Sequence, residues 1–431
     1  MANTHNLKNR IWFLIGSILI FRIGSFIPIP GINISILQKF LIQKHNSILE
    51  IFNLFSGGSL NRASIFALGV MPYISASIII QLLSVVCSSL KELKKEGEFG
   101  KNKINQYTRF ITFFLACAQS FSVIIGLPYI PGMKNIIIRS GFEFYFPAVT
   151  SLVTGTIFLM WLGELITEKG LGNGISLIIF SGILAGLPKS IANTLEYFFL
   201  NQLNLFYCFL ILITMVFVIY LVVVIEQSQR NIVVYYARQQ QNRNMYLKNS
   251  NYLPLKLNMA GVVPVIFSSS IILFPSMIAT YFHNIFHEQK WFFSFLFSLR
   301  PNHFLYFLIY IFLIIFFCFF YTGLIFNVKD TSDNLKKSGA FLPGIRPGIQ
   351  TAKYINKIVL RLTFIGSLYT VFICLMPEIM RYFFHVPFYF GGTSLLIIVV
   401  VIIEFITQIQ TFIMSTQYTS VLKKANLFLK I

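Results

Sequence analysis

Few residues in this sequence have a type and spacing that could support catalysis or metal binding. His283 and His287 are four residues apart, which places two imidazoles on one helix face, but no third ligand lies near them. The sequence has no P-loop, GxSxG turn or HExxH motif, and no pair of carboxylates within an apolar segment. We therefore expect no enzyme, no metal and no cofactor. A pH-dependent turnover assigned to a side chain would revive the enzyme alternative.

Charged side chains are sparse in the apolar segments, where a charge is usually kept for a function. Arg22 lies near the outer end of the first segment, Glu404 lies in the last, and Glu164 and Glu226 lie near cytoplasmic ends of others. Ion-coupled transporters need such groups as ion sites, so this sparse set makes proton or sodium coupling unattractive. A secondary transporter with two inverted halves stays an open alternative.

The cysteines give no sign of a disulfide or a metal site. They lie in or beside apolar runs, at irregular spacing and without a CxxC pair, so we expect small core residues. They are Cys87, Cys117, Cys208, Cys318 and Cys374.

The composition is that of an integral membrane protein. The chain has 431 residues, a mean hydropathy of +0.74, and only 11% charged residues. A soluble domain carries about 25% charged residues, more than twice this share. The net charge of +20 could indicate nucleic-acid binding. We prefer the simpler explanation that Lys and Arg fill the cytoplasmic loops of a multi-span protein, and we expect no direct DNA binding.

Apolar runs long enough to cross a bilayer, roughly 20 residues each, recur along the whole chain. The predicted spans are 11–29, 64–86, 110–130, 146–166, 175–191, 205–225, 259–282, 304–326, 359–379 and 394–412. Lys and Arg gather at both termini and in the second, sixth and eighth loops, which predicts that both termini are cytoplasmic. The first span lacks a small-residue cleavage site, so we expect it to be retained.

The stretch 52–83 differs from a simple anchor. It begins with a glycine-broken apolar piece and continues into a span that contains Gly69, Pro72 and several small polar residues. Such irregularity suits a helix that faces a cavity or another helix, so we expect a pore-lining helix with a re-entrant segment before it. Neutral polar residues in other spans have two possible explanations. They form helix-to-helix hydrogen bonds of well under about 1 kcal/mol each, or they line a seam between helices that can open.

The sixth and eighth loops are the most polar. The sixth, 226–256, is rich in Gln, Asn and Arg, and the eighth, 327–357, contains a proline- and glycine-stiffened turn with Arg346 near its tip. From spacing alone, a solvated basic turn explains Arg346 better than a docking site does.

Five long motifs resemble the SecY family of protein-conducting channel subunits, in wording most like its gammaproteobacterial members. They are GVMPYISASIIIQLL (69–83), MWLGELITEKGLGNGISLIIF (160–180), LPLKLNMAGVVPVIF (253–267), DNLKKSGAFLPGIRPG (333–348) and FYFGGTSLLIIVVV (388–401). The similarity covers essentially the whole chain.

The resemblance implies an all-α polytopic membrane protein. Its ten transmembrane helices form two pseudo-symmetric five-helix halves around an hourglass pore, with a short plug helix. The first half is 1–193, the sixth helix and its basic loop are 194–256, and the remaining helices, the eighth loop and the tail are 257–431.

The resemblance also implies roles for single residues. The pore ring is Val70, Ile74, Ile179, Ile183, Ile266 and Ile397. The plug is Phe52, Asn53, Leu54, Phe55, Ser56, Gly57, Gly58, Ser59 and Leu60. Polar residues of the lateral gate are Gln81, Gln119 and Asn258, and cations that dock a motor or a ribosome are Arg238, Arg243, Lys248 and Arg346. The resemblance thus reverses the preference stated above for Arg346.

The function implied is a passive, gated channel in the bacterial inner membrane. Unfolded secretory polypeptides with a signal sequence cross it, and hydrophobic segments leave it sideways into membrane lipid. The partners implied are SecE-like and SecG-like subunits, the SecA ATPase and the translating ribosome, whose RNA phosphates suit clustered cations.

Overall fold

The computed structural model describes residues 2–33, 56–126, 137, 141–199, 205–236, 251–282, 304–384 and 392–428. The chain divides into two compact units. The first comprises Met1–Glu196, Ser269–Tyr306 and Val401–Ile431, and the second comprises Tyr197–Ser268 and Phe307–Val400. Two helices cross this division well inside their length, α10 (Val263–Phe282) and α15 (Gly392–Phe428), and α8 (Gly174–Phe199) and α12 (Phe304–Ile325) cross it by three residues at one end.

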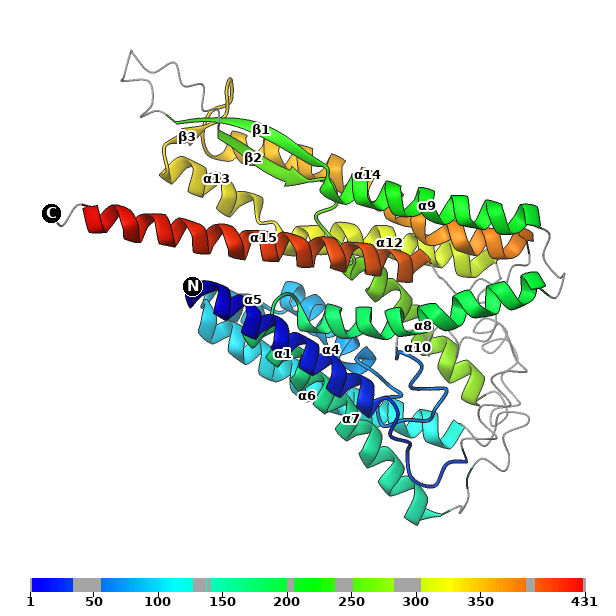
Figure 1. Ribbon diagram of the computed structural model, residues 1–431. Coiled ribbons are helices and arrows are strands. Elements are labelled where there is room, and N and C mark those ends of the chain that lie inside the picture. Colours follow the sequence, from blue (N-terminus) through cyan, green and yellow to red (C-terminus); the bar gives the residue numbers. More distant parts are fainter. Residues whose placement is uncertain are drawn as a thin grey trace. The chain divides into compact units, whose positions relative to one another are not determined.

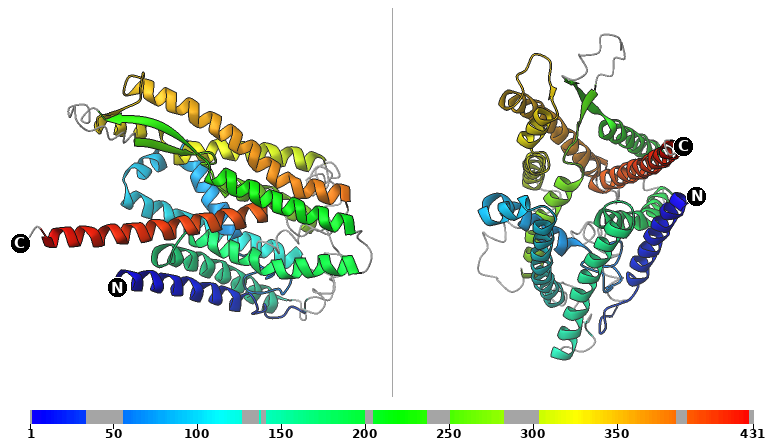
Figure 2. Two further views of the ribbon diagram at one scale, coloured as in Figure 1. Left: turned by 45° about the horizontal axis from the view of Figure 1, so that its top comes forward. Right: turned by 90° about the vertical axis from the view of Figure 1, so that its left-hand side faces the viewer.

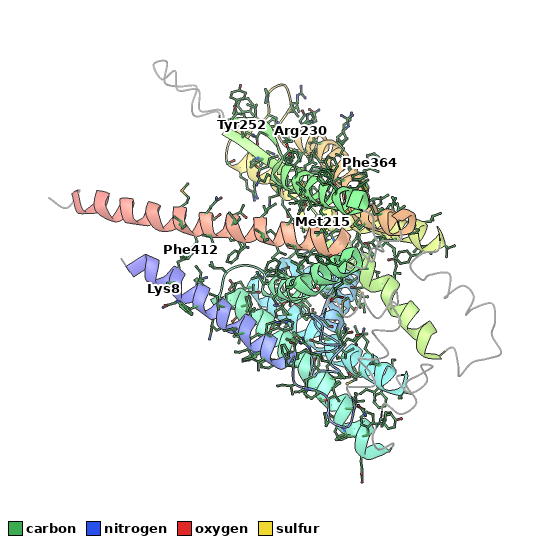
Figure 3. All side chains as sticks on the ribbon, turned by 45° about the vertical axis from the view of Figure 1, so that its right-hand side comes forward. Lys8, Met215, Arg230, Tyr252, Phe364 and Phe412 are labelled. Carbon is green, nitrogen blue, oxygen red and sulfur yellow. The ribbon has the colours of Figure 1, made fainter. Side chains whose placement is uncertain are left out.

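Helices account for nearly all of the first unit. They are α1 (Ala2–Gly24), α4 (Met71–Val86), α5 (Ser88–Lys95), α6 (Glu98–Gly126), α7 (Phe142–Lys169) and most of α8 (Gly174–Phe199). Helix α4 packs against α6, α6 against α7, and α7 against α1 (Figures 1 and 2). Phe412 of α15 (Figure 3) lies under the guanidinium of Arg10, whose Cζ is 5.5 Å from the ring centroid, so α1 and the second part of α15 are in contact.

The second unit combines long helices with a small sheet. Its helices are α9 (Leu205–Gln227), α12 (Phe304–Ile325), α13 (Val328–Lys337) and α14 (Ile349–Phe384). Its strands are β1 (Gln229–Tyr236), β2 (Asn251–Lys256) and β3 (Ala340–Phe341), in the antiparallel order β2-β1-β3. Figure 3 shows Arg230 and Tyr252 on the β1–β2 hairpin.

A helix occupies each predicted span, as a bilayer requires because only helices satisfy every backbone group internally in this class of protein. Within the described residues, five helices are long and apolar enough to cross a membrane, and the pair α4 and α5, bent by 99°, makes a sixth. Shorter apolar helices, 174–188, 212–227 and 263–272, lie in three more of the predicted spans. Large apolar side chains on α9 and α12, such as Phe217 and Phe312, are exposed, which suits contact with lipid.

Several predicted boundaries were wrong. Helix α4 begins at Met71, and residues 65–70 before it form turns, so the second span starts later than residue 64. Helix α6 begins at Glu98 and α14 at Ile349, in both cases about three turns before the apolar run. Hydropathy marks where lipid begins, whereas a helix can continue into water with charged residues.

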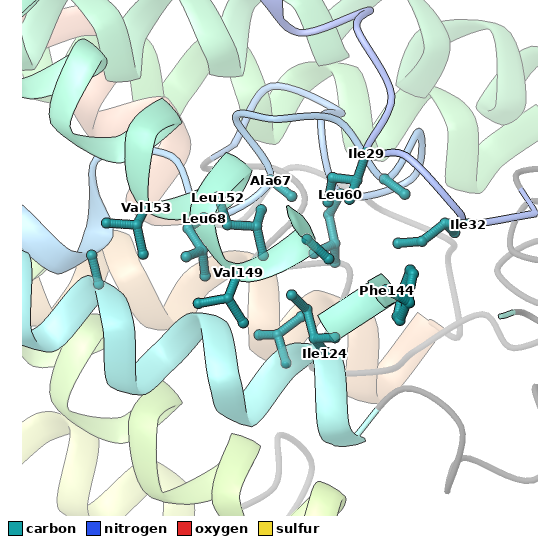
Figure 4. Packing of buried hydrophobic residues seen from close by; sticks show 14 residues of the cluster. Ile29, Ile32, Leu60, Ala67, Leu68, Ile124, Phe144, Val149, Leu152 and Val153 are labelled. Carbon is teal, nitrogen blue, oxygen red and sulfur yellow. The ribbon is translucent and has the colours of Figure 1, made fainter. Parts of the chain in front are cut away.

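The core of the first unit joins the loop after α1, the turns before α4, and helices α6 and α7. Ile29 and Leu60 of the loops meet Ile124 of α6 and Leu152 of α7 in one buried cluster (Figure 4). The loop contacts are fixed by backbone hydrogen bonds, Ile29 N to Ala63 O at 2.7 Å and Ile65 N to Ile27 O at 3.0 Å. The segment that leads into α4 is therefore held by packing and not left to solvent.

The sheet was not predicted, since the sixth loop was expected to be polar and irregular. Ile232 and Val234 of β1 point to one side and join Leu255 of β2 and Leu342 in a second buried cluster with α14. The fold is thus mostly helical, with a three-stranded platform built from the two basic loops.

Candidate functional site

The six candidate ring residues are all buried aliphatic side chains. Val70 and Ile74 lie at the start of α4, and Ile179 and Ile183 lie on α8; the i, i+4 spacing places each pair on one face. Ile266 on α10 and Ile397 on α15 belong to the second unit. None of these side chains can bind an ion, so each suits a water-excluding neck.

Part of the candidate plug can be followed. Residues 52–55 lie outside the described residues, and residues 56–60 form turns, so the expected plug helix is not present in this part. Gly57 and Gly58 have φ of 69° and 83°, which glycine adopts without strain. These turns explain why two glycines are needed here.

The plug segment touches α8 through the backbone. A Cβ placed on Gly57 would lie 2.9 Å from the Cα of Gly182, the residue before Ile183. Arg22 Nη1 donates a hydrogen bond of 3.2 Å to the carbonyl of Gly57 from the end of α1. The candidate plug thus lies directly beside a candidate ring residue, a contact that sequence analysis missed because 125 positions separate the two glycines.

The two gate glutamines lie on helices that pack together, α4 and α6. Gln81 Nε2 donates to Ser77 Oγ at 3.1 Å, whereas Gln81 Oε1 and Gln119 Oε1 are buried without a hydrogen-bond partner. Buried polar atoms are normally paired, so these two oxygens are available to a hydrogen-bond donor.

A further link joins α10 to α4. Ser270 Oγ donates to the sulfur of Met71 at 3.7 Å, within the first unit. Ser270 belongs to the serine run 268–270, which is visible in the sequence, but Met71 has no sequence feature that marks it as a partner. The donor and acceptor form a weak contact that can break at low cost.

Asn258 has stronger partners, all in the second unit. Its Nδ2 donates to Glu226 Oε1 at 2.6 Å, and its Oδ1 accepts from the backbone N of Gly261 at 3.2 Å. Gly366 of α14 leaves room for this turn, since a Cβ there would lie 3.1 Å from the carbonyl of Leu257. Asn258 therefore fixes the turn before α10 to the end of α9.

Among the candidate docking cations, Arg346 is exposed in the turn after β3. Hydroxyl groups hold the turn on both sides of it: Thr351 Oγ1 donates to Arg346 O at 2.9 Å, and Ser332 Oγ donates to Gly348 O at 2.7 Å. These bonds fix the backbone of the turn, and the Arg346 side chain is exposed on it. Arg238, Arg243 and Lys248 lie outside the described residues.

No group of three or more potential metal ligands occurs in the described part of the chain. His283 and His287 lie outside it. Cys318 and Cys374 are buried, as expected, but Cys87 is exposed at the bend between α4 and α5, so its assignment to the core was wrong. No arrangement described here is suited to catalysis.

Comparisons with known proteins agree on one family. The SecY family model matches residues 64–406. Protein translocase subunit SecY of Escherichia coli strain K12 is 59% identical over 421 residues, covering 98% of this chain and 95% of the relative. The SecY of Buchnera aphidicola from Acyrthosiphon pisum is 62% identical over 426 residues, covering 99% and 97%.

Solved structures have the same fold. A structure described as that of a protein conducting channel matches with a TM-score of 0.67 at 15% identity, covering 94% of this chain and 92% of that one. Sec61 in a canine ribosome-channel complex from the endoplasmic reticulum matches with a TM-score of 0.65 at 16% identity, with the same coverage. The chain therefore belongs to the SecY family: it is a polytopic membrane protein, the channel subunit of a Sec protein translocase, and not an enzyme.

Proposed function

We propose that this SecY-family chain acts as a passive gated channel that is sealed by an aliphatic neck and by the segment 52–60. The contact between Gly57 and Gly182 carries the proposal, because it seats the candidate plug against the helix that bears Ile179 and Ile183. Unfolded secretory polypeptides would displace this segment and pass the neck. Energy would come from a partner motor, from translation or from the proton-motive force.

The neck would exclude ions without binding them. Branched aliphatic side chains give ions no ligands, so a narrow neck lined by them loses water readily. The same side chains are compliant, and they can close around an extended polypeptide. The burial of all six candidates supports this assignment.

Lateral release would use the seam between α4 and α10, on the helix α4 that also packs against α6. Its described polar contact is the weak one between Ser270 and Met71, and Gln81 and Gln119 leave oxygens unpaired. Interhelical hydrogen bonds in membranes average about 0.6 kcal/mol, so an apolar signal helix with comparable contacts could part such a seam. Asn258, the third candidate gate residue, is anchored by Glu226 within the second unit.

The basic platform would dock the energy source. Arg346, on its fixed turn, and the cations of 237–250 suit an acidic motor surface such as SecA, or ribosomal RNA phosphates. In this proposal, both termini and the platform lie in the cytoplasm of a bacterium. The chain lies in the inner membrane, with SecE-like and SecG-like subunits beside it.

Crosslinking to an arrested precursor tests the neck. A photoreactive residue at Ile74, Ile183 or Ile397 should crosslink to the translocating chain. The same probe at the exposed neighbours Ile79, Leu184 and Ile402 on the same helices should not. Equal crosslinking at both sets would reject the neck assignment.

Reconstitution separates the channel from a transporter. Vesicles that hold the complex should import a signal-bearing precursor when the motor is present, and they should not accumulate small solutes along an ion gradient. Gradient-driven solute uptake without precursor passage would contradict the proposal.

A further inference from the structure

Arg10 joins three helices of the first unit. Its Nη1 donates a hydrogen bond of 3.1 Å to the carbonyl of Gly170, the residue that ends α7. Its Cζ lies 5.5 Å from the ring centroid of Phe412 on α15 (Figure 3). One half-buried side chain of α1 thus contacts both the end of α7 and the second part of α15.

Each contact has its own physical reason. The last carbonyls of a helix have no partner within the helix, and they form the negative end of its dipole, so a guanidinium is a suitable cap for α7. The face of the Phe412 ring attracts the same cation electrostatically. An arginine that only reached for water would make neither contact.

The hairpin formed by α7 and α8 is stiff. Gly163 and Gly174 bring the two helices so close together that a Cβ on Gly174 would collide with the carbonyl oxygen of Gly163. Thr167 Oγ1 accepts a hydrogen bond of 2.9 Å from the N of Gly174. The hairpin should therefore move as one piece, and its second helix carries the candidate ring residues Ile179 and Ile183.

Helix α15 also touches the turn of this hairpin directly. A Cβ placed on Gly172 would lie 3.5 Å from Oε1 of Gln408, so this side chain lies beside the turn. Gln408 and Phe412 are four residues apart, which places them on one face of α15. Because α15 is one continuous helix, fixing this face also restrains its first part, which bears the candidate ring residue Ile397.

We propose that Arg10 is a positioning residue for the neck. Its contacts with Gly170 and Phe412, the Arg10 clasp, fasten α15 to the hairpin of α7 and α8, so that the two ring-bearing helices α8 and α15 cannot move independently in the closed channel. This inference rests on the proposed neck. It gives a role to a side chain that the neck, the plug and the docking surface do not account for.

Ion leak through reconstituted complexes without precursor tests this role. Arg10→Gln removes the charge that both contacts use, and leak should rise about fivefold or more, the lower end of typical couplings between sites. Phe412→Leu removes the ring from the other side of the clasp and should raise leak as well. The double variant should leak about as much as Arg10→Gln alone, because the contact with Phe412 is already lost there.

Two further variants separate the clasp from charge and from folding. Lys8→Gln removes an exposed cation of the same helix and should leave leak unchanged (Figure 3). Arg10→Lys keeps the charge and a donor, so it should leak less than Arg10→Gln. A purely structural role would lower the unfolding midpoint of Arg10→Gln without raising leak, and that result would overturn the proposal.

A spin label at the exposed Met414, two residues after Phe412, reports on the clasp without a transport assay. In a chain whose own cysteines are replaced by serine, this label should become more mobile in Arg10→Gln than in the wild type or in Lys8→Gln. Equal mobility in all three would reject the clasp.

Ile397→Asn is the reference for the neck in the same leak assay. Leak in Ile397→Asn but not in Arg10→Gln would overturn the clasp and leave the neck standing. Leak in neither variant would reject the neck itself, and this inference with it.

Discussion

The backbone contact between Gly57 and Gly182 leads to the sharpest prediction. Replacing Gly57 by Ala places a Cβ 2.9 Å from the Cα of Gly182, well inside the 3.5–4.0 Å of an optimal carbon contact, so the segment must shift away from α8. Gly58→Ala is a matched control, since Gly58 also has a positive φ but its Cβ would meet nothing within 4 Å.

The difference between the two variants isolates the contact. Both carry the cost of a left-handed conformation, about 1–2 kcal/mol. Only Gly57→Ala adds the cost of overpacking, about 1–3 kcal/mol. If the plug leaves α8 on opening, this added term applies to the closed state alone and shifts the closed-to-open ratio by about 5- to 150-fold.

Ion leak through reconstituted complexes without precursor measures this shift. Gly57→Ala should leak well above Gly58→Ala at equal protein amounts, and it should accept precursors with weaker signal sequences. Equal leak in the two variants would refute the idea that the contact with α8 seals the channel.

Other substitutions test the remaining assignments. Ile397→Asn should hydrate the neck, which raises ion leak and relaxes the requirement for a strong signal sequence. Ile402→Asn, on the exposed side of α15, should change neither property. Equal ion leak in the two variants would count against Ile397 in the ring. Arg346→Glu should reduce motor-driven import several-fold at normal protein levels. Lys353→Glu, which reverses an exposed charge on α14, should leave import unchanged. Normal import with Arg346→Glu would show that the turn has no docking role. Arg109→Gln breaks the bidentate pair with Glu164 but should cost under about 1 kcal/mol in unfolding experiments, because the Arg109 side chain is 51% exposed.

The sequence was sufficient to predict the helices but not all of their ends. Long apolar runs define the spans, whereas α6 and α14 continue past their apolar runs as charged helices, from Glu98 and Ile349. Strand β1 does show the alternation typical of a strand, since the buried Ile232 and Val234 alternate with residues on the other face, but this pattern was not used to predict it.

The sequence did not distinguish single candidate functional residues from similar neighbours. Ile183 and Leu184 are both aliphatic neighbours on α8, yet one is buried and the other 44% exposed, and no property of the side chains predicts which. Only the resemblance to the SecY family could select the six candidate ring residues. Long-range partners such as Glu226 for Asn258 depend on how α9 and the turn before α10 meet, which no local pattern records.

Hydrogen bonds in the candidate plug segment differ in length from those at Asn258 and in the candidate docking turn. Inside the segment 56–60 the bonds are long, Ser59 N to Ser56 O and Leu60 N to Ser56 Oγ, both 3.4 Å, and Arg22 adds one of 3.2 Å. Its far end is held more closely, by bonds of 2.9 Å from Ser64 N to Ser59 O and 3.0 Å from Ala63 N to Leu60 O. The anchor of Asn258 on Glu226 is 2.6 Å, and the turn around Arg346 is closed by bonds of 2.7 and 2.9 Å. Short bonds to charged groups contribute about 1.5–3 kcal/mol, whereas long neutral ones contribute less than the typical 1 kcal/mol. A gate needs a part that leaves its seat at low cost and a surface that does not yield when a partner pushes on it. The long bonds inside the candidate plug segment would suit the first property, and the short bonds of the candidate docking turn would suit the second.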